Sequence, residues 1–281
     1  MNKYDDKYTQ CPACTSDNIK YFHADFRGNT IYKCDECKVQ FMNPVYSDEY
    51  LDDYYSQYID ISRDVDTVLQ DKYDLIVNDN FKAIEKVSPN KGSMLDFGIG
   101  NGDHAKLAIK KGWQVKGYDV DCKATEGLMK RTGIDIQCGN FFDLNWGEKK
   151  FDLIYANQVV EHLKNPAAYI KHFKSLLSDN GCLFIAVPNI RSTSIKLKFM
   201  LEKLKLRKNK IGKYYDAEHH IFYFDPISLK NILENNGYEV VVSKNCVKPK
   251  VERSKLWLFL SNHIFEKFYS TSTFMVAARK I

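Results

Sequence analysis

Short apolar runs alternate with stretches of helical periodicity over most of the chain after residue 90. The run at 94–97 predicts a strand, residues 104–111 predict a helix that ends at Gly112, and residues 113–118 predict a second strand. The same alternation predicts helices near 122–131 and over 166–177, and strands at 134–138, 151–156 and 182–187. This order is typical of a parallel sheet covered by helices on both faces, with its ligand at the carboxyl ends of the strands.

The last part of the chain predicts one more helix and two more strands. Asp225 and Pro226 begin the helix, which ends near Gly237. Residues 238–243 and 273–278 are the two strands. The predicted fold class is therefore α/β, a Rossmann-like doubly wound sheet that is mostly parallel.

A glycine turn follows the first predicted strand and indicates a nucleoside or nucleotide ligand. Gly98, Gly100 and Gly102 let backbone amides approach a ligand closely, and the helix that follows presents its unpaired N–H groups at the same place. Asp119 comes directly after the second strand, where an acid holds ribose hydroxyls. Either a dinucleotide or S-adenosylmethionine satisfies these features.

The residue at the third glycine of the dinucleotide pattern separates the two cofactors. That pattern is GxGxxG, whereas this chain has Asp103 at the last position. A carboxylate at the entrance of the helix is unfavourable beside a pyrophosphate. It suits a ligand with a sulfonium and a free amino group, which Asp96 at the end of the first strand is placed to contact. These residues favour S-adenosylmethionine.

Five motifs in order resemble those of class I S-adenosylmethionine-dependent methyltransferases. They are LDFGIGNG, GYDVD, GNFFDL, FDLIYANQVVEHLKNP and GCLFIAVPN. The resemblance covers residues 93–190 and extends more loosely to 281. It implies that the strands at 238–243 and 273–278 form a terminal antiparallel hairpin.

The resemblance also implies where the cofactor lies. Asp119 would hold the ribose hydroxyls, and Asn140 and Phe141 would contact the adenine. The cofactor-binding candidates are Asp96, Gly98, Gly100, Asn101, Gly102, Asp119, Asn140, Phe141 and Asn157.

Composition restricts the remaining possibilities. With 281 residues, 44% hydrophobic and 14% aromatic, the chain can bury a substantial core. It contains no run of 18 apolar residues, and its first residues lack the apolar core of a signal peptide, so we expect a cytoplasmic protein. The net charge of +5 permits nucleic acid binding but does not require it.

Four of the eight cysteines have the spacing of a structural zinc site. Cys11 and Cys14 form CPAC, and Cys34 and Cys37 form CDEC, so two tight turns offer four thiolates to one tetrahedral ion. Disulfide pairing is the less favoured interpretation, because a cytosolic chain stays reduced. We assign no chemistry to the remaining cysteines, which are Cys122, Cys138, Cys182 and Cys246. The predicted domains are a zinc ribbon over 1–43, a helical connector over 44–90 and a methyltransferase domain over 91–281.

Histidine is the first candidate for the base of a methyl transfer to oxygen, because it takes a proton near neutral pH. His162 follows the fourth strand, where the acceptor would bind, although it could instead orient the turn before Pro166. The further catalytic candidates are His219, His220 and Glu161. In some methyltransferases an acid three residues before such a Glu-His pair binds a divalent cation. Gln158 stands there in this chain, which argues against a catalytic metal.

A basic insertion at about 190–218 is too long for a simple connection. Ile195, Phe199 and Leu206 are predicted to share one face of an amphipathic helix among lysines. Over 195–213 this segment could contact an anionic membrane at its inner face, grip phosphates, or form an ordinary lid. Residues 254–268 predict a second apolar surface or a segment packed on the sheet.

The ribbon joined to this domain resembles bacterial enzymes that methylate sugars in surface polysaccharides and natural products. That resemblance implies O-methylation of a saccharide acceptor, either free, nucleotide-linked, lipid-linked or polymeric. An RNA methyltransferase that grips phosphates with the ribbon and the insertion is the rival enzyme. A scaffold without catalysis is a further alternative, although the glycine turn and Asp119 are intact.

Overall fold

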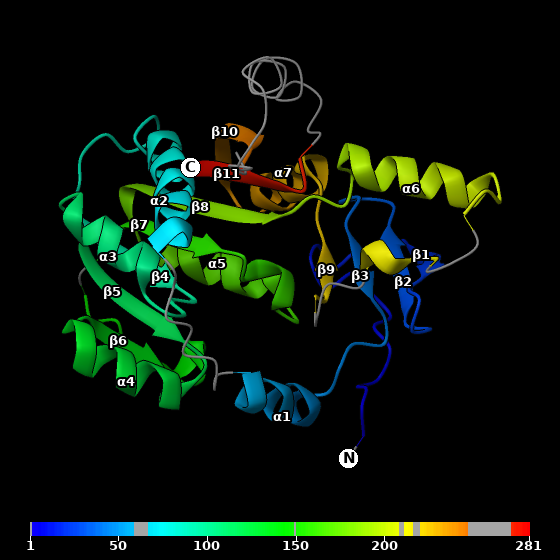
Figure 1. The fold of residues 1–281 in the computed structure, drawn as a ribbon, viewed down its shortest axis with the longest axis horizontal. Coiled ribbons are helices and arrows are strands. Elements are labelled where there is room, and N and C mark those ends of the chain that lie inside the picture. Colours follow the sequence, from blue (N-terminus) through cyan, green and yellow to red (C-terminus); the bar gives the residue numbers. More distant parts are fainter. Residues whose placement is uncertain (1, 59–66, 149, 208–210, 216–219, 247–270) are drawn as a thin grey trace.

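A computed structural model describes residues 2–58, 67–148, 150–207, 211–215, 220–246 and 271–281. Within these residues a seven-stranded sheet lies between helices, and a four-stranded sheet stands beside it (Figure 1). His219 and the apolar segment 254–268 lie outside the described residues.

The large sheet has the strand order β10-β11-β8-β7-β4-β5-β6. Its strands are β4 (Ser93–Phe97), β5 (Gln114–Asp119), β6 (Asp135–Cys138), β7 (Phe151–Asn157), β8 (Leu177–Pro188), β10 (Tyr238–Asn245) and β11 (Thr273–Lys280). The five strands β6, β5, β4, β7 and β8 run parallel to one another, whereas β11 runs antiparallel to both β8 and β10. The prediction of a doubly wound sheet with a terminal antiparallel hairpin is confirmed.

Helices cover both faces of this sheet. On one face lie α2 (Thr67–Ile84), α3 (Asp103–Lys110) and α4 (Cys122–Thr132), where Phe81, Tyr155 and Phe184 stack in series. On the other lie α5 (Pro166–Leu176) and α7 (Pro226–Asn235). Since successive residues of a strand point to opposite faces, strands buried on both sides appear as the continuous apolar runs of the sequence.

The predicted helix starts at Asn165 and Asp225 are confirmed by capping contacts. The Asn165 side chain accepts a hydrogen bond from the amide of Ala168, and Pro166 occupies the first turn. Asp225 and Ser228 form a reciprocal capping box at the start of α7. Local side-chain chemistry therefore sets where these helices begin.

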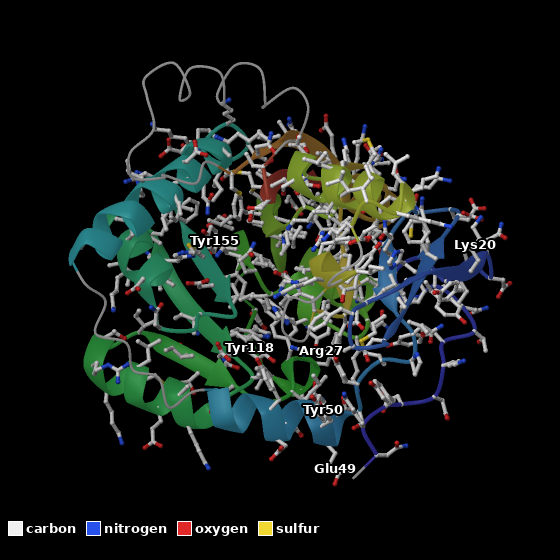
Figure 2. The ribbon with its side chains drawn as sticks, turned by 45° about the vertical axis from the view of Figure 1, so that its right-hand side comes forward. Lys20, Arg27, Glu49, Tyr50, Tyr118 and Tyr155 are labelled. Carbon is white, nitrogen blue, oxygen red and sulfur yellow. A yellow bond between two sulfur atoms is a disulfide. The ribbon has the colours of Figure 1, made fainter. Side chains whose placement is uncertain are left out.

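The small sheet includes Cys34 and takes one strand from far along the chain. It consists of β1 (Ile19–Ala24), β2 (Thr30–Cys34), β3 (Gln40–Met42) and β9 (Phe222–Tyr223), in that order. Phe41 and Phe222 stack across the β3–β9 pair with ring centroids 5.9 Å apart. After the sheet, α1 (Asp48–Tyr58) leads toward the main domain. Figure 2 shows Lys20 of the small sheet away from Tyr118 and Tyr155 of the large sheet.

The helix of the basic insertion differs from its prediction. α6 (Thr193–Lys203) ends before Leu206, whose side chain is 72% exposed. Ile195 and Phe199 are partly buried, so they share the inner face as expected, but Leu206 does not join them. Lys205 has a positive φ, which turns the chain away from the helical path. Among the described residues no helix is both long and apolar enough to cross a membrane.

Two cysteines that the sequence analysis left without chemistry are bonded to each other. Cys122 begins α4 and Cys138 ends β6, and they form a disulfide with a Cα–Cα distance of 5.1 Å. The β5–α4–β6 crossover returns the chain to the same edge of the sheet, which brings two positions 16 residues apart into contact. Spacing alone did not indicate this pair.

Candidate active site

The glycine turn lies between β4 and α3 and packs directly on the loop after β7. The amides of Gly98 and Ile99 both donate hydrogen bonds to the carbonyl of Tyr118, at 2.8 and 2.9 Å. Gly98 has a φ of 78°, and a Cβ there would lie 2.4 Å from Cγ2 of Val159. Only glycine permits this conformation and this approach, so the turn and the loop after β7 form one surface.

Asp119 lies at the carboxyl end of β5, beside this turn. Its Oδ2 accepts a hydrogen bond of 3.0 Å from the amide of Gly100, and its Oδ1 accepts one from Asp121. Burial raises the pKa of Asp119 above its ordinary value, although these amides oppose the shift. The carboxylate therefore braces the glycine turn, and its contact with ribose hydroxyls stays a prediction.

Asp96, at the carboxyl edge of β4, is a buried acid whose ionised form a cationic partner would stabilise. Its side chain is 3% exposed, and its Oδ2 has no hydrogen-bond partner among the described residues. Burial, helped by the nearby Asp119 charge, raises the pKa of Asp96 to about 7. A ligand ammonium would compensate the ionised form, so the residues present fit the amino group of S-adenosylmethionine.

We expect Asp96→Asn to stabilise the ligand-free protein and to weaken S-adenosylmethionine binding. The pKa of Asp96 is raised by folding, so its ionisation destabilises the fold as pH rises from about 4 to about 7. Removing this charge should add about 1–3 kcal/mol to the free energy of unfolding at pH 7, less than the full linkage because the buried amide also lacks a partner. Thermal unfolding against pH and calorimetric titration measure the two effects.

The matched control is Asp135→Asn, which removes an exposed carboxylate paired with Lys116. Wild type and this control should lose stability together between pH 4 and 7, whereas Asp96→Asn should not. Affinity for the cofactor should rise with pH in the wild type and stay flat in Asp96→Asn. Parallel profiles for all three proteins would show that Asp96 is not the titrating group.

The two successive phenylalanines of the GNFFDL motif differ in burial. The Phe141 ring is fully buried in the aromatic core against Phe97 and Phe173, and its predicted contact with the adenine stays a prediction. Phe142 is 43% exposed and lies 4.6 Å from Tyr169, ring centroid to centroid. The pattern of two successive phenylalanines could not say which one faces the core.

The three asparagines predicted at the cofactor lie around the same edge. Asn140 caps the 3-10 helix η1 (Phe141–Asp143), where its Oδ1 accepts from the amide of Phe142. Asn101 is in the glycine turn and donates to Asp103 at 2.6 Å. Asn157 ends β7 and is half-buried. Their contacts with a cofactor remain predictions.

The catalytic candidates come together after β7. Glu161 and His162 belong to the 3-10 helix η2 (Val160–His162), and His220 precedes β9. The His162 and His220 rings lie 4.7 Å apart, centroid to centroid, and His220 Nε2 is 4.0 Å from Glu161 Oε1. Glu161 is fully buried, which raises the pKa of its carboxyl to about 8. Two histidines far apart in the sequence thus share one buried acid.

Ile221 joins this histidine cluster to the ribbon. Its amide donates to the carbonyl of Glu161 at 2.8 Å, and its own carbonyl accepts from the amide of Met42 at 2.8 Å. A side chain makes a further contact with β3 of the ribbon, because the Tyr215 hydroxyl donates to Gln40 Oε1 at 2.6 Å. Any distortion of β3 would therefore be transmitted to His220 and Glu161.

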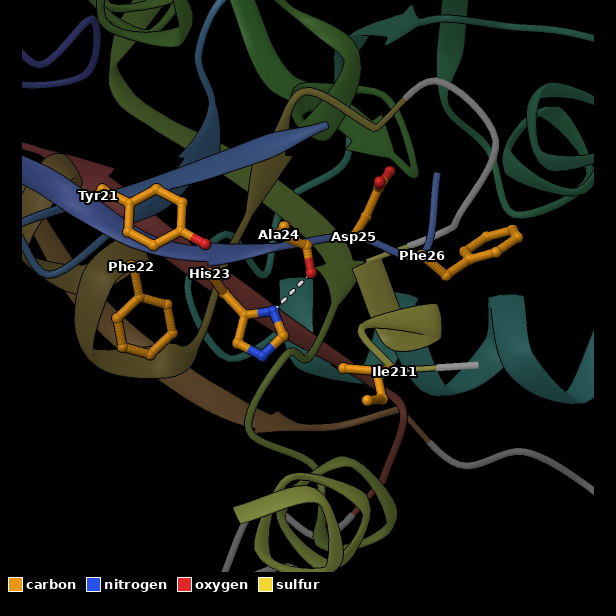
Figure 3. Close-up of a pocket in the computed structure, with 7 residues that line it drawn as sticks. All are labelled: Tyr21, Phe22, His23, Ala24, Asp25, Phe26 and Ile211. Carbon is orange, nitrogen blue, oxygen red and sulfur yellow. Dashed lines mark hydrogen bonds between the residues drawn. The ribbon is translucent and has the colours of Figure 1, made fainter. Parts of the chain in front are cut away.

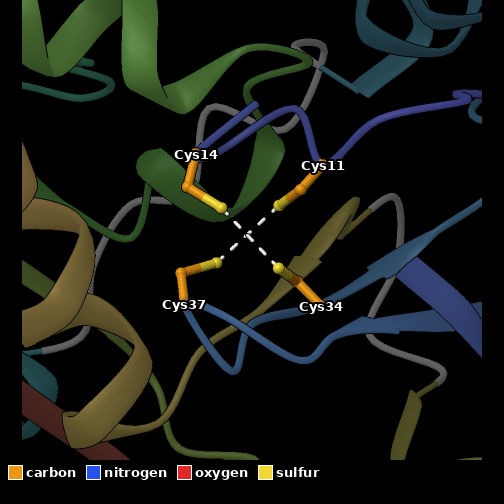
Figure 4. A group of neighbouring side chains, drawn as sticks. All are labelled: Cys11, Cys14, Cys34 and Cys37. Atoms are coloured by element: carbon orange, nitrogen blue, oxygen red, sulfur yellow. Dashed lines mark hydrogen bonds between the residues drawn. The ribbon is translucent and has the colours of Figure 1, made fainter. Parts of the chain in front are cut away.

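The four ribbon cysteines converge on one point (Figure 4). Cys11 Sγ lies 3.7 Å from Cys37 Sγ, and Cys14 Sγ lies 3.6 Å from Cys34 Sγ. A tetrahedral zinc ion with Zn–S bonds of about 2.3 Å requires sulfurs about 3.8 Å apart. The four cysteines fit such an ion, and none of them is in a disulfide in the described structure.

Glu161, His162 and His220 also have ligand atoms within 4.8 Å of one another, so this group could hold a divalent cation. Gln158 stands three residues before Glu161, and its Nε2 donates to the carbonyl of Ala186 at 3.1 Å. The same three residues can act as a base held by an acid, which needs no metal.

A cavity of about 550 Å³ lies on the ribbon, apart from the glycine turn (Figure 3). Its lining comes from β1 and the loop after it, together with Ile211. His23 lies in its wall, with Nδ1 2.5 Å from the carbonyl of Ala24. No residue of the glycine turn or of the histidine cluster lines this cavity, so we do not place the reaction there.

The family of the chain follows from comparison with known sequences. A family described as a methyltransferase domain matches residues 69–243, more than half of the chain. The chain belongs to the methyltransferase domain family. The ubiquinone biosynthesis O-methyltransferase of Coxiella burnetii is 29% identical over 114 residues, which are 38% of this chain and 49% of that protein. The chain thus spans about half the length of the curated relatives it matches.

Solved structures agree on the fold of this methyltransferase domain. Burkholderia thailandensis 1,6-didemethyltoxoflavin-N1-methyltransferase, solved with S-adenosylhomocysteine, is 16% identical, with a TM-score of 0.55 over 93% of this chain and 99% of that chain. Magnesium protoporphyrin IX methyltransferase from Synechocystis, also with S-adenosylhomocysteine, is 14% identical, with a TM-score of 0.51 over 83% of this chain and 95% of that chain. The prediction of a methyltransferase is confirmed at the level of family and fold.

Proposed function

We propose that this protein is an S-adenosylmethionine-dependent O-methyltransferase that acts on a saccharide hydroxyl. The observation that carries the proposal is the placement of the buried Glu161 and of His162 on the loop that packs against Gly98, with His220 beside them. The cofactor edge and a proton-accepting group thus lie on adjoining segments, as an in-line methyl transfer to oxygen requires.

On the cofactor side, the residues suit a ligand with a charged methionine end. S-adenosylmethionine, when bound, supplies a methyl group on a positively charged sulfur. Asp96 would hold its ammonium, Asp119 would accept hydrogen bonds from the ribose hydroxyls, and Phe142 would border the adenine. These residues orient the ligand without taking part in proton transfer.

On the acceptor side we assign the base to His220. Its imidazole would take the proton of the acceptor hydroxyl as the new oxygen–carbon bond forms. Glu161, near His220 Nε2, would act as a carboxylate that stabilises the imidazolium, and the imidazolium would in turn compensate the charge of this buried acid. His162 packs edge to face on His220 and limits its orientation.

The acceptor class rests on the resemblance of the ribbon and main domain to sugar-modifying enzymes. The ribbon would support the acceptor side of the site, because Ile221 hydrogen-bonds to both Met42 of the ribbon and Glu161. A structural zinc ion held by the four cysteines would keep the ribbon in place. Aromatic hydroxyls are the second acceptor class, since the curated relatives are ubiquinone biosynthesis O-methyltransferases.

Calorimetric titration with S-adenosylmethionine, with NAD as control, tests the proposal first. Binding of the former alone is expected, after which nucleotide sugars, free glycosides and catechols are screened with radiolabelled methyl donor. Methylation of catechols but not of saccharides would overturn the saccharide assignment. Preference for NAD, or transfer to RNA alone, would overturn the proposed function.

Replacing His220 with glutamine should lower kcat by about 10²–10⁴ while S-adenosylmethionine affinity stays unchanged, because the imidazole acts on the acceptor proton. Glu161→Gln should lower kcat less than the His220 variant does and should shift the pH profile of kcat. His162→Gln is the matched control, since its ring packs on His220 without serving as the base. A larger loss in His162→Gln than in His220→Gln would assign the base to His162, and a loss on chelation that added metal restores would assign a metal.

A further inference from the structure

Helix α6 is apolar on two opposite faces, and only one of them is covered. Its inner face packs on the ribbon. The Phe199 ring lies parallel to the Phe22 ring, with the ring centroids 6.1 Å apart. The centroid of the His23 ring is 5.7 Å from that of Phe199. Ile195 packs against the main core. These contacts fix which side of α6 faces the protein.

The outer face carries a stripe of large apolar side chains. Leu197 is 51% exposed, Met200 is 50% exposed and Leu204, which caps the helix, is 58% exposed. At about 100° per residue these three positions fall within roughly 60° of helical arc, opposite Ile195 and Phe199. Leu206, the next apolar residue after this stripe, is 72% exposed. A continuous apolar surface thus faces outward.

Lysines border the stripe on both sides. The helical spacing places Lys196 and Lys203 along one flank and Lys198 along the other, and all three are exposed. The one acid of α6, Glu202, lies away from the stripe, where Tyr214 donates to its Oε2 at 2.9 Å and Arg207 lies 3.4 Å from its Oε1. The rim of the outer face is therefore positively charged, and no acidic side chain of α6 lies there to neutralise the lysines.

We propose that the outer face of α6, formed by Leu197, Met200, Leu204 and the flanking lysines, docks on an anionic phospholipid surface. An apolar stripe between cationic flanks suits the boundary of acyl chains and acidic headgroups. Nucleic acid would use the lysines but would leave the leucines exposed to water, so it fits less well.

The position of α6 makes this docking compatible with catalysis. In Figure 1, α6 lies at one end of the long axis, and α3 and α4, beside the cofactor edge, lie at the other. A membrane against α6 would thus leave the glycine turn open to a water-soluble cofactor. The proposal does not depend on the acceptor, since lipid binding can be measured without turnover.

Co-sedimentation of the full chain with phosphatidylcholine vesicles, with and without phosphatidylglycerol, tests this inference. Binding is expected only with phosphatidylglycerol and should weaken as salt rises. The variant Leu197→Ser/Leu204→Ser should bind about tenfold more weakly, because two half-exposed leucines no longer enter the lipid boundary. Lys196→Gln/Lys203→Gln should also bind about tenfold more weakly, since each juxtamembrane lysine contributes.

The matched control is Leu75→Ser/Ile109→Ser, which removes two apolar side chains of similar exposure, 61% and 46%, from α2 and α3. This control should bind like the wild type. Equal binding of the two serine variants would overturn the proposal, as would binding that does not depend on phosphatidylglycerol. Self-association that disappears in Leu197→Ser/Leu204→Ser, without vesicle binding, would assign the surface to a second copy of the chain instead.

Discussion

Replacing Asp119 with alanine should weaken S-adenosylmethionine binding about a hundredfold or more. Two charge-assisted hydrogen bonds to ribose hydroxyls together contribute about 3 kcal/mol, which corresponds to that factor. The variant also loses the acceptor for the Gly100 amide, which is 3.0 Å from Oδ2 in the structure. The glycine turn would therefore be less well ordered before the cofactor binds. Calorimetric titration measures the affinity, and circular dichroism verifies that the fold is kept.

Asp119→Asn separates these two contributions. The amide oxygen can still accept from Gly100, but the side chain is no longer an anion with two acceptors for the ribose. We expect it to bind the cofactor with an affinity between those of wild type and Asp119→Ala. Equal affinity for wild type and Asp119→Ala would contradict the ribose assignment, and equal loss in both variants would mean that the brace on Gly100 contributes little.

Replacing Cys11 and Cys34 together with serine should abolish zinc binding and unfold the ribbon. Metal binding supplies about 10–16 kcal/mol in zinc-finger peptides, and a small ribbon has little core of its own to replace it. Atomic absorption measures the zinc content, and limited proteolysis reports unfolding of residues 2–46. S-adenosylmethionine affinity should be unchanged, because the cofactor edge belongs to β4, β5 and β7 of the large sheet.

Cys246→Ala is the control for this variant, because Cys246 is a buried cysteine outside the ribbon and is not in a disulfide. It should retain one zinc ion per chain and the wild-type proteolysis pattern. Once an acceptor is known, the ribbon variant should lose turnover, since Ile221 would no longer be held by Met42 and the His220 cluster would lose its support. Retained zinc in the Cys11→Ser/Cys34→Ser protein would contradict the four-cysteine site.

The features that could be predicted from sequence are those that depend on neighbours in the chain. The strand, glycine turn and helix at 93–110 combine an apolar run, residues that tolerate positive φ and a helical period, all within a few residues of one another. The caps at Asn165 and Asp225 are local in the same way. Their physical causes act over one turn of helix or less.

The choice between Phe141 and Phe142 shows where such reasoning stops. Both belong to the same motif, and only the packing of Phe141 against Phe97 and Phe173 decides which one is buried. The same holds for the Cys122–Cys138 bond, which depends on α4 and β6 meeting at one edge. These outcomes depend on contacts between elements that the chain brings together only after folding.

By itself, the sequence determined the α/β class, the order of the elements, the glycine turn with Asp96 and Asp119, and the four cysteines as one group. Only the tertiary structure decided that β9 joins the ribbon sheet, that His220 lies beside Glu161 and His162, and that α6 exposes Leu197, Met200 and Leu204. The reason is physical. Propensity, capping and periodicity act between near neighbours, whereas burial and the pairing of distant strands depend on the free energy of the whole packed chain.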